Sequence, residues 1–67
     1  MRYYSFNEFD GTDNIVCTMS EEEIRKEYYP YWLDRMNKKF GEQFVRKMYC
    51  FEDCLDDWIV INWAWEV

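Results

Sequence analysis

The only proline of this chain, Pro30, lies inside the segment with the strongest helical pattern. Ser20 and Glu23, at the start of that segment, have the spacing of a capping box, in which each side chain bonds the other residue's backbone N–H. Proline lacks a backbone N–H and costs about 3 kcal/mol in a helix interior. The sequence therefore predicts a helix kinked at Pro30, or two helices over 21–28 and 30–40 with Pro30 in the first turn of the second.

Apolar and aromatic side chains recur through this segment at the spacing that places them on one face of a helix. They are Ile24, Tyr28, Tyr31, Trp32, Met36 and Phe40. Three glutamates at 21–23 precede all of them, and acidic side chains are favourable near a helix N-terminus. We expect this stripe to face the hydrophobic core.

The first twenty residues have the pattern of a β-hairpin. Residues 2–9 are rich in aromatic side chains that partly alternate, and residues 15–19, with the sequence IVCTM, favour a strand. Asp10 and Gly11 begin a cluster of turn-forming residues between them, and glycine readily adopts the positive φ of tight hairpin turns. We predict two antiparallel strands.

The C-terminal segment, FEDCLDDWIVINWAWEV, fits two structures. A helix would place six apolar residues on one face, namely Phe51, Cys54, Leu55, Trp58, Ile61 and Trp65. A strand over 59–67 would alternate between two faces, and both faces could then be buried. Because no glycine or proline separates a helical part from a strand-like part, we predict one continuous element and favour the helix.

The predicted fold class is α+β, with a single domain spanning residues 1–67. The N-terminal β-hairpin packs on the Pro-kinked helix and on a C-terminal helix, and a third strand in place of the latter is the alternative. A domain of this length buries only about 60% of the surface that its unfolded chain exposes. Because 22% of the residues are aromatic, more than such a core needs, we expect a homo-oligomer, most simply a symmetric dimer.

A C-terminal helix would leave part of its apolar surface without a partner. Exposed apolar patches mark interaction sites, and tryptophan is enriched among the residues that dominate binding energy. Three apolar residues fall outside the core-facing stripe, and three acidic residues lie near them in the sequence. The predicted binding surface consists of Trp63, Ile59, Val60, Asp53, Asp56 and Asp57.

Charge restricts the partners of this surface. The net charge is −6, and the chain from Tyr49 onward contains five acidic residues and no basic one. Nucleic-acid binding requires Lys and Arg to neutralise phosphates, so we expect no direct contact with nucleic acid. An acidic end instead attracts a basic protein surface. The sequence also lacks an apolar run long enough to cross a membrane.

Cysteine and histidine usage argues against a metal site, a cofactor and catalysis. The chain has three cysteines, an odd number with no leader sequence before them, and no histidine. Structural zinc sites prefer Cys and His ligands, and nucleophilic catalysis commonly pairs Ser or Cys with His. No glycine-rich phosphate loop is present either. We expect a cytoplasmic protein that is not an enzyme and holds no metal or cofactor.

Two stretches, the capping box leading into EYYPYW and the closing DDWIVINWAWEV, resemble small acidic, Trp- and Tyr-rich accessory proteins encoded by bacteriophages. Such proteins often disable bacterial defence systems or host enzymes by stoichiometric binding, and others sequester nucleotide signals. The resemblance implies an inhibitor of a host or defence protein that acts in the bacterial cytosol.

The alternative is an oligomeric protein that sequesters a small molecule such as a nucleotide signal. Aromatic side chains would stack on the base, and arginines would pair with the phosphates. The candidate residues for this ligand are Tyr28, Tyr31, Trp32, Arg25 and Arg35.

Overall fold

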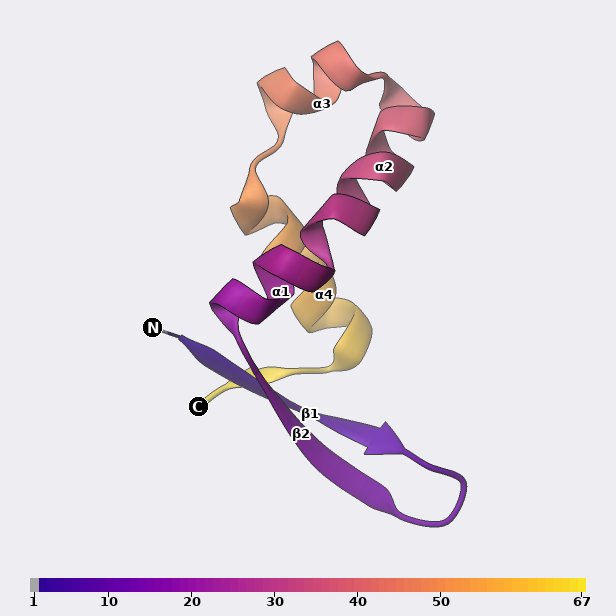
Figure 1. The fold of residues 1–67 in the computed structure, drawn as a ribbon, viewed down its shortest axis with the longest axis vertical. Helices are drawn as coiled ribbons and strands as arrows, with labels where there is room; N and C mark the ends of the chain where they lie inside the picture. The colour runs from indigo at the N-terminus through magenta and orange to yellow at the C-terminus, as the bar shows by residue number, and fades with distance from the viewer. Residues whose placement is uncertain (1) are drawn as a thin grey trace.

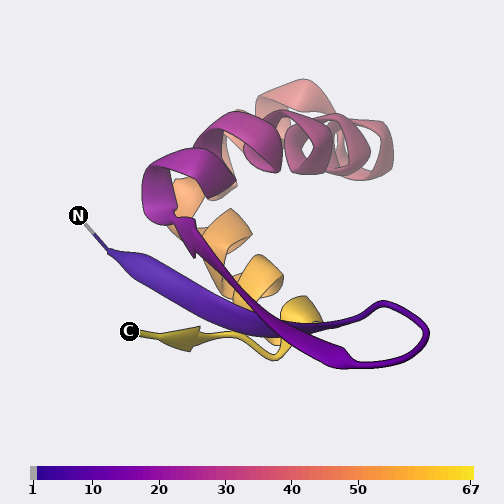
Figure 2. The same ribbon diagram turned by 60° about the horizontal axis from the view of Figure 1, so that its bottom comes forward.

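The computed structural model describes residues 2–67, which form an α+β fold with an antiparallel sheet and four helices (Figure 1). The elements are β1 (Tyr3–Phe9), β2 (Asn14–Ser20), α1 (Glu21–Glu27), α2 (Tyr29–Phe40), α3 (Glu42–Met48), α4 (Phe51–Asn62) and β3 (Trp65–Glu66). The strand order is β2-β1-β3, so β1 is the central strand. Figure 2 shows the helices on one side of the sheet, and no helix within residues 2–67 covers its other face.

The predicted N-terminal hairpin is confirmed. Its strands pair in a register that runs from Tyr3 opposite Ser20 to Phe9 opposite Asn14. In the turn, Asp10 accepts backbone hydrogen bonds from Asp13 at 2.8 Å and Thr12 at 2.9 Å. These donors, with Asp13 contributing most, hold the pKa of Asp10 below its ordinary value. Gly11 supplies a positive φ of 102°, which explains why a glycine follows the aspartate.

The helical segment divides at Pro30, which confirms the two-helix prediction. Ser20 and Glu23 form the predicted capping box at the start of α1. Tyr28 separates α1 from α2, and Pro30 lies in the first turn of α2. The missing N–H of proline costs no helical hydrogen bond there, because N–H groups of the first turn have no partner within the helix. Helical backbone hydrogen bonds continue across the break, because the Tyr28 N–H donates to the Ile24 carbonyl and the Tyr28 carbonyl accepts from the Trp32 N–H. Figure 1 shows α2 leading away from the sheet after this junction.

The prediction of one continuous C-terminal element is wrong. Helix α4 ends at Asn62, Trp63 has a left-handed backbone (φ 53°, ψ 40°), and the chain returns as β3. The Trp63 N–H bonds the carbonyl of Val60, and the Ala64 N–H bonds that of Ile59. This pair of bonds is a Schellman motif, which normally places glycine at the left-handed position. Both expected structures are therefore present, the helix first and the third strand after it.

Strand β3 pairs antiparallel with β1, through Tyr4 opposite Glu66 and Ser5 opposite Trp65. Trp65 therefore lies on the open face of the sheet and is 42% exposed, so its predicted place in the core is wrong. Ile61 is 58% exposed and is also outside the core. The reason is the same for both: the core-facing spacing assumed a helix that continued and packed over its full length.

The core lies between the sheet and helices α1, α2 and α4. Its buried side chains are Tyr4, Ile24, Trp32, Phe51, Cys54, Leu55 and Trp58. Trp58 meets the rings of Tyr4 and Phe6 edge to face, at centroid distances of 6.2 and 5.4 Å, a favourable aromatic geometry. The Nε1–H of Trp32 donates to Oδ2 of Asp57 at 2.8 Å, which satisfies the one polar group of that buried ring.

The stripe predicted on the first helical segment is partly confirmed. Four of its members are buried or pack against the core: Ile24, Tyr28, Trp32 and Met36. Tyr31 and Phe40 are exposed instead. The far end of α2 extends beyond the sheet and has little core beneath it, which explains the exposure of Phe40 (Figure 1). None of the helices within residues 2–67 is long and apolar enough to cross a membrane.

Candidate protein-interaction surface

Exposed apolar side chains gather where α4 ends. Trp63 is 88% exposed, Val60 is 73% exposed and Ile61 is 58% exposed. We call these three residues the C-terminal patch. Two of its members, Trp63 and Val60, belong to the surface expected from the sequence, whereas Ile59 is only partly exposed and packs against the core. Ile59 and Ala64 occupy the two positions of the Schellman motif that are commonly apolar, and both pack against the core.

The backbone of Trp63 makes its exposure notable. A left-handed conformation costs a residue with a Cβ roughly 1–2 kcal/mol, and Trp63 is the only such non-glycine among residues 2–67. Glycine or asparagine would fit this position with less strain. A bulky apolar residue in a strained conformation and in contact with solvent contributes little to folding. Strain and exposure of this kind are found together at ligand-binding positions.

Acidic side chains lie one helical turn before the C-terminal patch. Asp56 precedes Val60 by four residues and Asp57 precedes Ile61 by four, so each pair shares a face of α4. Two carboxylates are fixed by internal donors. Asp53 accepts from the backbone N–H of Cys50 at 2.8 Å, and Asp57 accepts from Trp32. Each carboxylate keeps free acceptor positions, since it offers about four lone-pair directions.

The same three carboxylates border a cavity of about 470 Å³, which we call the acidic pocket. Its lining residues are Trp32, Met36, Lys39, Phe40, Tyr49, Asp53, Asp56 and Asp57. Carboxylates beside aromatic rings favour cations, through charge and through the ring faces. The Nζ of Lys39 already lies 5.2 Å from the centroid of the Phe40 ring. The pocket therefore suits a lysine or arginine side chain of a partner and disfavours a phosphate.

The residues considered for a nucleotide do not form a site with free arginines. The guanidinium of Arg25 stacks on the Phe51 ring at 4.2 Å, and that of Arg35 lies 5.8 Å from the Tyr31 ring. Trp32 is buried with Asp57 beside it, where it cannot stack on a base. Tyr28 is half-buried, burial raises the pKa of its hydroxyl, and that hydroxyl has no hydrogen-bond partner within residues 2–67. These contacts count against phosphate recognition here.

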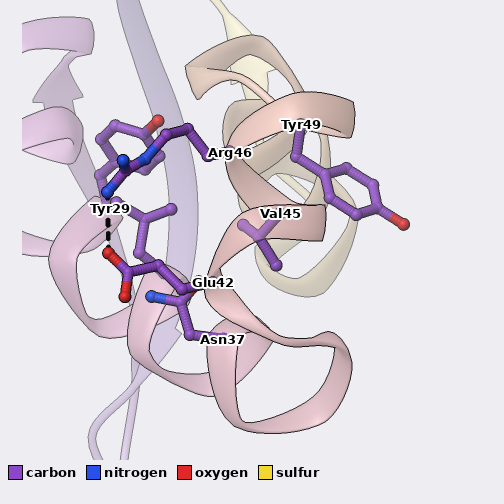
Figure 3. A pocket seen from close by; sticks show the side chains of 7 residues that line it. Tyr29, Asn37, Glu42, Val45, Arg46 and Tyr49 are labelled. Atoms are coloured by element: carbon purple, nitrogen blue, oxygen red, sulfur yellow. Dashed lines mark hydrogen bonds and ion pairs between the residues drawn. The ribbon is translucent and has the colours of Figure 1, made fainter.

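A second cavity, of about 310 Å³, lies between α2 and α3 (Figure 3). It is lined by Tyr29, Leu33, Asn37, Glu42, Val45, Arg46 and Tyr49. Its two charged groups, Arg46 and Glu42, pair with each other at 2.7 Å next to Tyr29 (Figure 3). The volume is at the lower limit for small-molecule sites. Because its charges are already paired and exposed, the cavity offers no evident catalytic group.

The three cysteines lie in different environments. Cys54 is fully buried, and burial raises its pKa to about 12. Cys17, on β2, donates from Sγ to Oε2 of Glu8 at 3.3 Å, and this bond raises its pKa. Cys50 is exposed before α4. No group of three potential metal ligands occurs within the part of the chain that the structure describes.

These environments predict a fixed order of thiol reactivity. At neutral pH a maleimide should label Cys50 first and Cys17 more slowly, because only the thiolate attacks and a raised pKa reduces its population. Cys54 should react only after denaturation. Peptide mapping by mass spectrometry during labelling would give the three rates. Rapid labelling of Cys54 in the folded protein would show that the core around α4 opens readily.

The acidic pocket was only partly evident from the sequence. Its carboxylates belong to the predicted surface, but Met36, Lys39, Phe40 and Tyr49 were not connected with them. They come from α2 and from the segment before α4, and no sequence spacing relates residues that meet only after folding. The sequence pattern predicted the two strands of the hairpin but not which sheet face the helices would cover. The open face of the sheet, which includes the exposed Phe9, was therefore not predicted.

Comparison with protein-family models, curated proteins and solved structures gives no match to this chain. The features of this chain that indicate a function are therefore a strained, exposed tryptophan with two apolar neighbours and an acidic pocket bordered by the preceding turns of the same helix.

Proposed function

We propose that this protein is a non-catalytic binding protein that blocks a partner protein by stoichiometric association through the C-terminal patch. The observation that carries this proposal is Trp63, which is 88% exposed at a backbone position that favours glycine. A residue that strains the fold and covers almost no core is best explained by a contact outside the chain.

The size of the available energy supports a protein partner. A tryptophan side chain presents roughly 200 Å², so burying most of Trp63 yields about 4–5 kcal/mol at ~25 cal/mol per Å² before association costs. Val60 and Ile61 would add apolar area around it, which excludes water from a central anchor. An anchor that projects from the surface requires a concave partner. A small ligand cannot provide one.

The acidic pocket adds a requirement for charge on the partner. A lysine or arginine placed about two to three helical turns from the cleft for Trp63 would reach Asp53, Asp56 and Asp57. Asp53 and Asp57 are already oriented by their internal donors, so little side-chain entropy is lost on binding. The resemblance to phage accessory proteins makes a bacterial host or defence protein in the cytosol the first class to test.

Affinity capture from a bacterial lysate tests this function. Wild-type bait should retain a protein in a near-equimolar amount, Trp63→Ala bait should lose it, and raised salt should weaken retention because charges contribute. Trp65→Ala, a second exposed tryptophan on the open sheet face, is the matched control and should retain the same protein. Retention that does not depend on Trp63, or co-purification of a nucleotide in its place, would exclude the proposal.

A further inference from the structure

Strand β2 forms an edge of the sheet that lacks the usual protection. Its sequence, NIVCTMS, contains no charged residue and no proline over seven residues, and nothing pairs with its outer side within residues 2–67. Natural sheets commonly protect exposed edges with lysine, proline or a bulge, because unpaired backbone groups invite another strand. Val16, near the middle of this edge, is 60% exposed.

The hydrogen-bond pattern shows which β2 groups point outward. Glu21 donates to Arg2 across the pair at one end of the hairpin, and Asp10 donates to Asp13 at the other. Because bonded and non-bonded pairs alternate in an antiparallel ladder, the odd-numbered residues of β2 direct their N–H and C=O groups toward β1. The even-numbered residues Asn14, Val16, Thr18 and Ser20 therefore present theirs to the outside.

We infer that β2 pairs with β2 of a second copy of this chain, antiparallel and centred on Cys17. In this register Val16 lies opposite the partner's Thr18, and Asn14 lies opposite the partner's Ser20. The backbone N–H and C=O groups that point away from β1 in one copy therefore face those of the other copy. Ser20 is buried, its N–H is already bonded to Glu23, and its carbonyl, as the N-cap of α1, accepts the first helical bond, so the intermolecular bonds come mainly from Val16 and Thr18. Shifting the centre to Val16 or Thr18 would shorten the paired length, and centring on Cys17 uses all seven residues.

A second copy is the best-matched occupant because the edge is complementary to itself. The strand carries no charge, so the net charge of −6 on each chain is not concentrated at the contact. The one like-charged pair in this register, Asp13 with the partner's Glu21, lies beyond the strand ends. Salt should therefore strengthen association by screening it. The C-terminal patch adjoins β3 at the opposite edge, so each copy keeps its patch free and this inference is independent of the proposed function.

Sedimentation of two Val16 variants tests the dimer. Val16→Pro removes an N–H that points away from β1, so the hairpin ladder is kept while two symmetric intermolecular bonds are lost. Dimerisation in the micromolar range should weaken at least about tenfold. Val16→Thr keeps the N–H and should dimerise as the wild type does, and near-ultraviolet circular dichroism would show both variants folded. A wild-type monomer, or a dimer that persists in folded Val16→Pro, would overturn the inference.

Cross-linking tests the register. Cys17 and the partner's Cys17 would form a non-hydrogen-bonded pair with Cα atoms about 4.5 Å apart, within the range for a disulfide. Mild oxidation with diamide should cross-link the Cys50→Ser variant through Cys17. The Cys17→Ser variant, which keeps the exposed Cys50, should remain uncrosslinked. A dimer that sediments normally but cross-links only through Cys50 would assign the interface to another surface.

Discussion

Replacement of Trp58 by alanine is expected to lower the free energy of unfolding by about 3–5 kcal/mol. Trp58 is 5% exposed and joins α4 to the central strand through its contacts with Tyr4 and Phe6. A domain of this size rarely has more than about 3–5 kcal/mol of stability from its core. The variant should therefore be largely unfolded at physiological temperature.

Urea denaturation followed by circular dichroism would measure this loss, with Trp65→Ala as the matched control. Trp65 is 42% exposed on the open sheet face, so at ~25 cal/mol per Å² its truncation should cost at most about 3 kcal/mol of transfer free energy and, unlike truncation of Trp58, should leave no enclosed cavity. Equal destabilisation by the two substitutions would mean that the open face is covered, for example by association, and the comparison should be repeated at high dilution.

Replacement of Trp63 by glycine is expected to separate folding from binding. Relief of the left-handed strain should raise the free energy of unfolding by about 0.5–1 kcal/mol, after allowance for the greater freedom of glycine in the unfolded chain. The same change removes the central side chain of the C-terminal patch. Affinity for the captured partner should fall by about 2 kcal/mol or more, a factor of roughly thirty.

Trp63→Ala isolates the backbone contribution, because it removes the same side chain but keeps a Cβ at the strained position. It should bind as weakly as Trp63→Gly and unfold at a lower urea concentration. Calorimetric titration and parallel denaturation would supply both numbers. If Trp63→Gly destabilises the protein by several kcal/mol, the indole ring contributes to the fold and the C-terminal patch is not a binding surface.

The features that the sequence determined are local. Asp10 and Gly11 specify the hairpin turn, Ser20 and Glu23 cap α1, and Pro30 divides the helical segment, each through contacts within about four residues. The first half of α4 follows from the same logic, since Phe51, Cys54, Leu55 and Trp58 share one helical face. Such signals are readable because the interacting groups are close in the chain.

The end of α4 was decided by tertiary structure. Helix and strand patterns overlap in residues 59–67, and only the free edge of β1, more than fifty residues earlier in the chain, selects a strand there. The Val67 N–H bonds the Tyr3 carbonyl, and the turn that delivers it forces Trp63 into a left-handed backbone. The exposure of Trp63 depends on this geometry, and the acidic pocket depends on the meeting of α2 and Tyr49 with the first half of α4. Neither can be inferred from spacing, because backbone hydrogen bonds and cavity walls are supplied by residues that meet only in the folded protein.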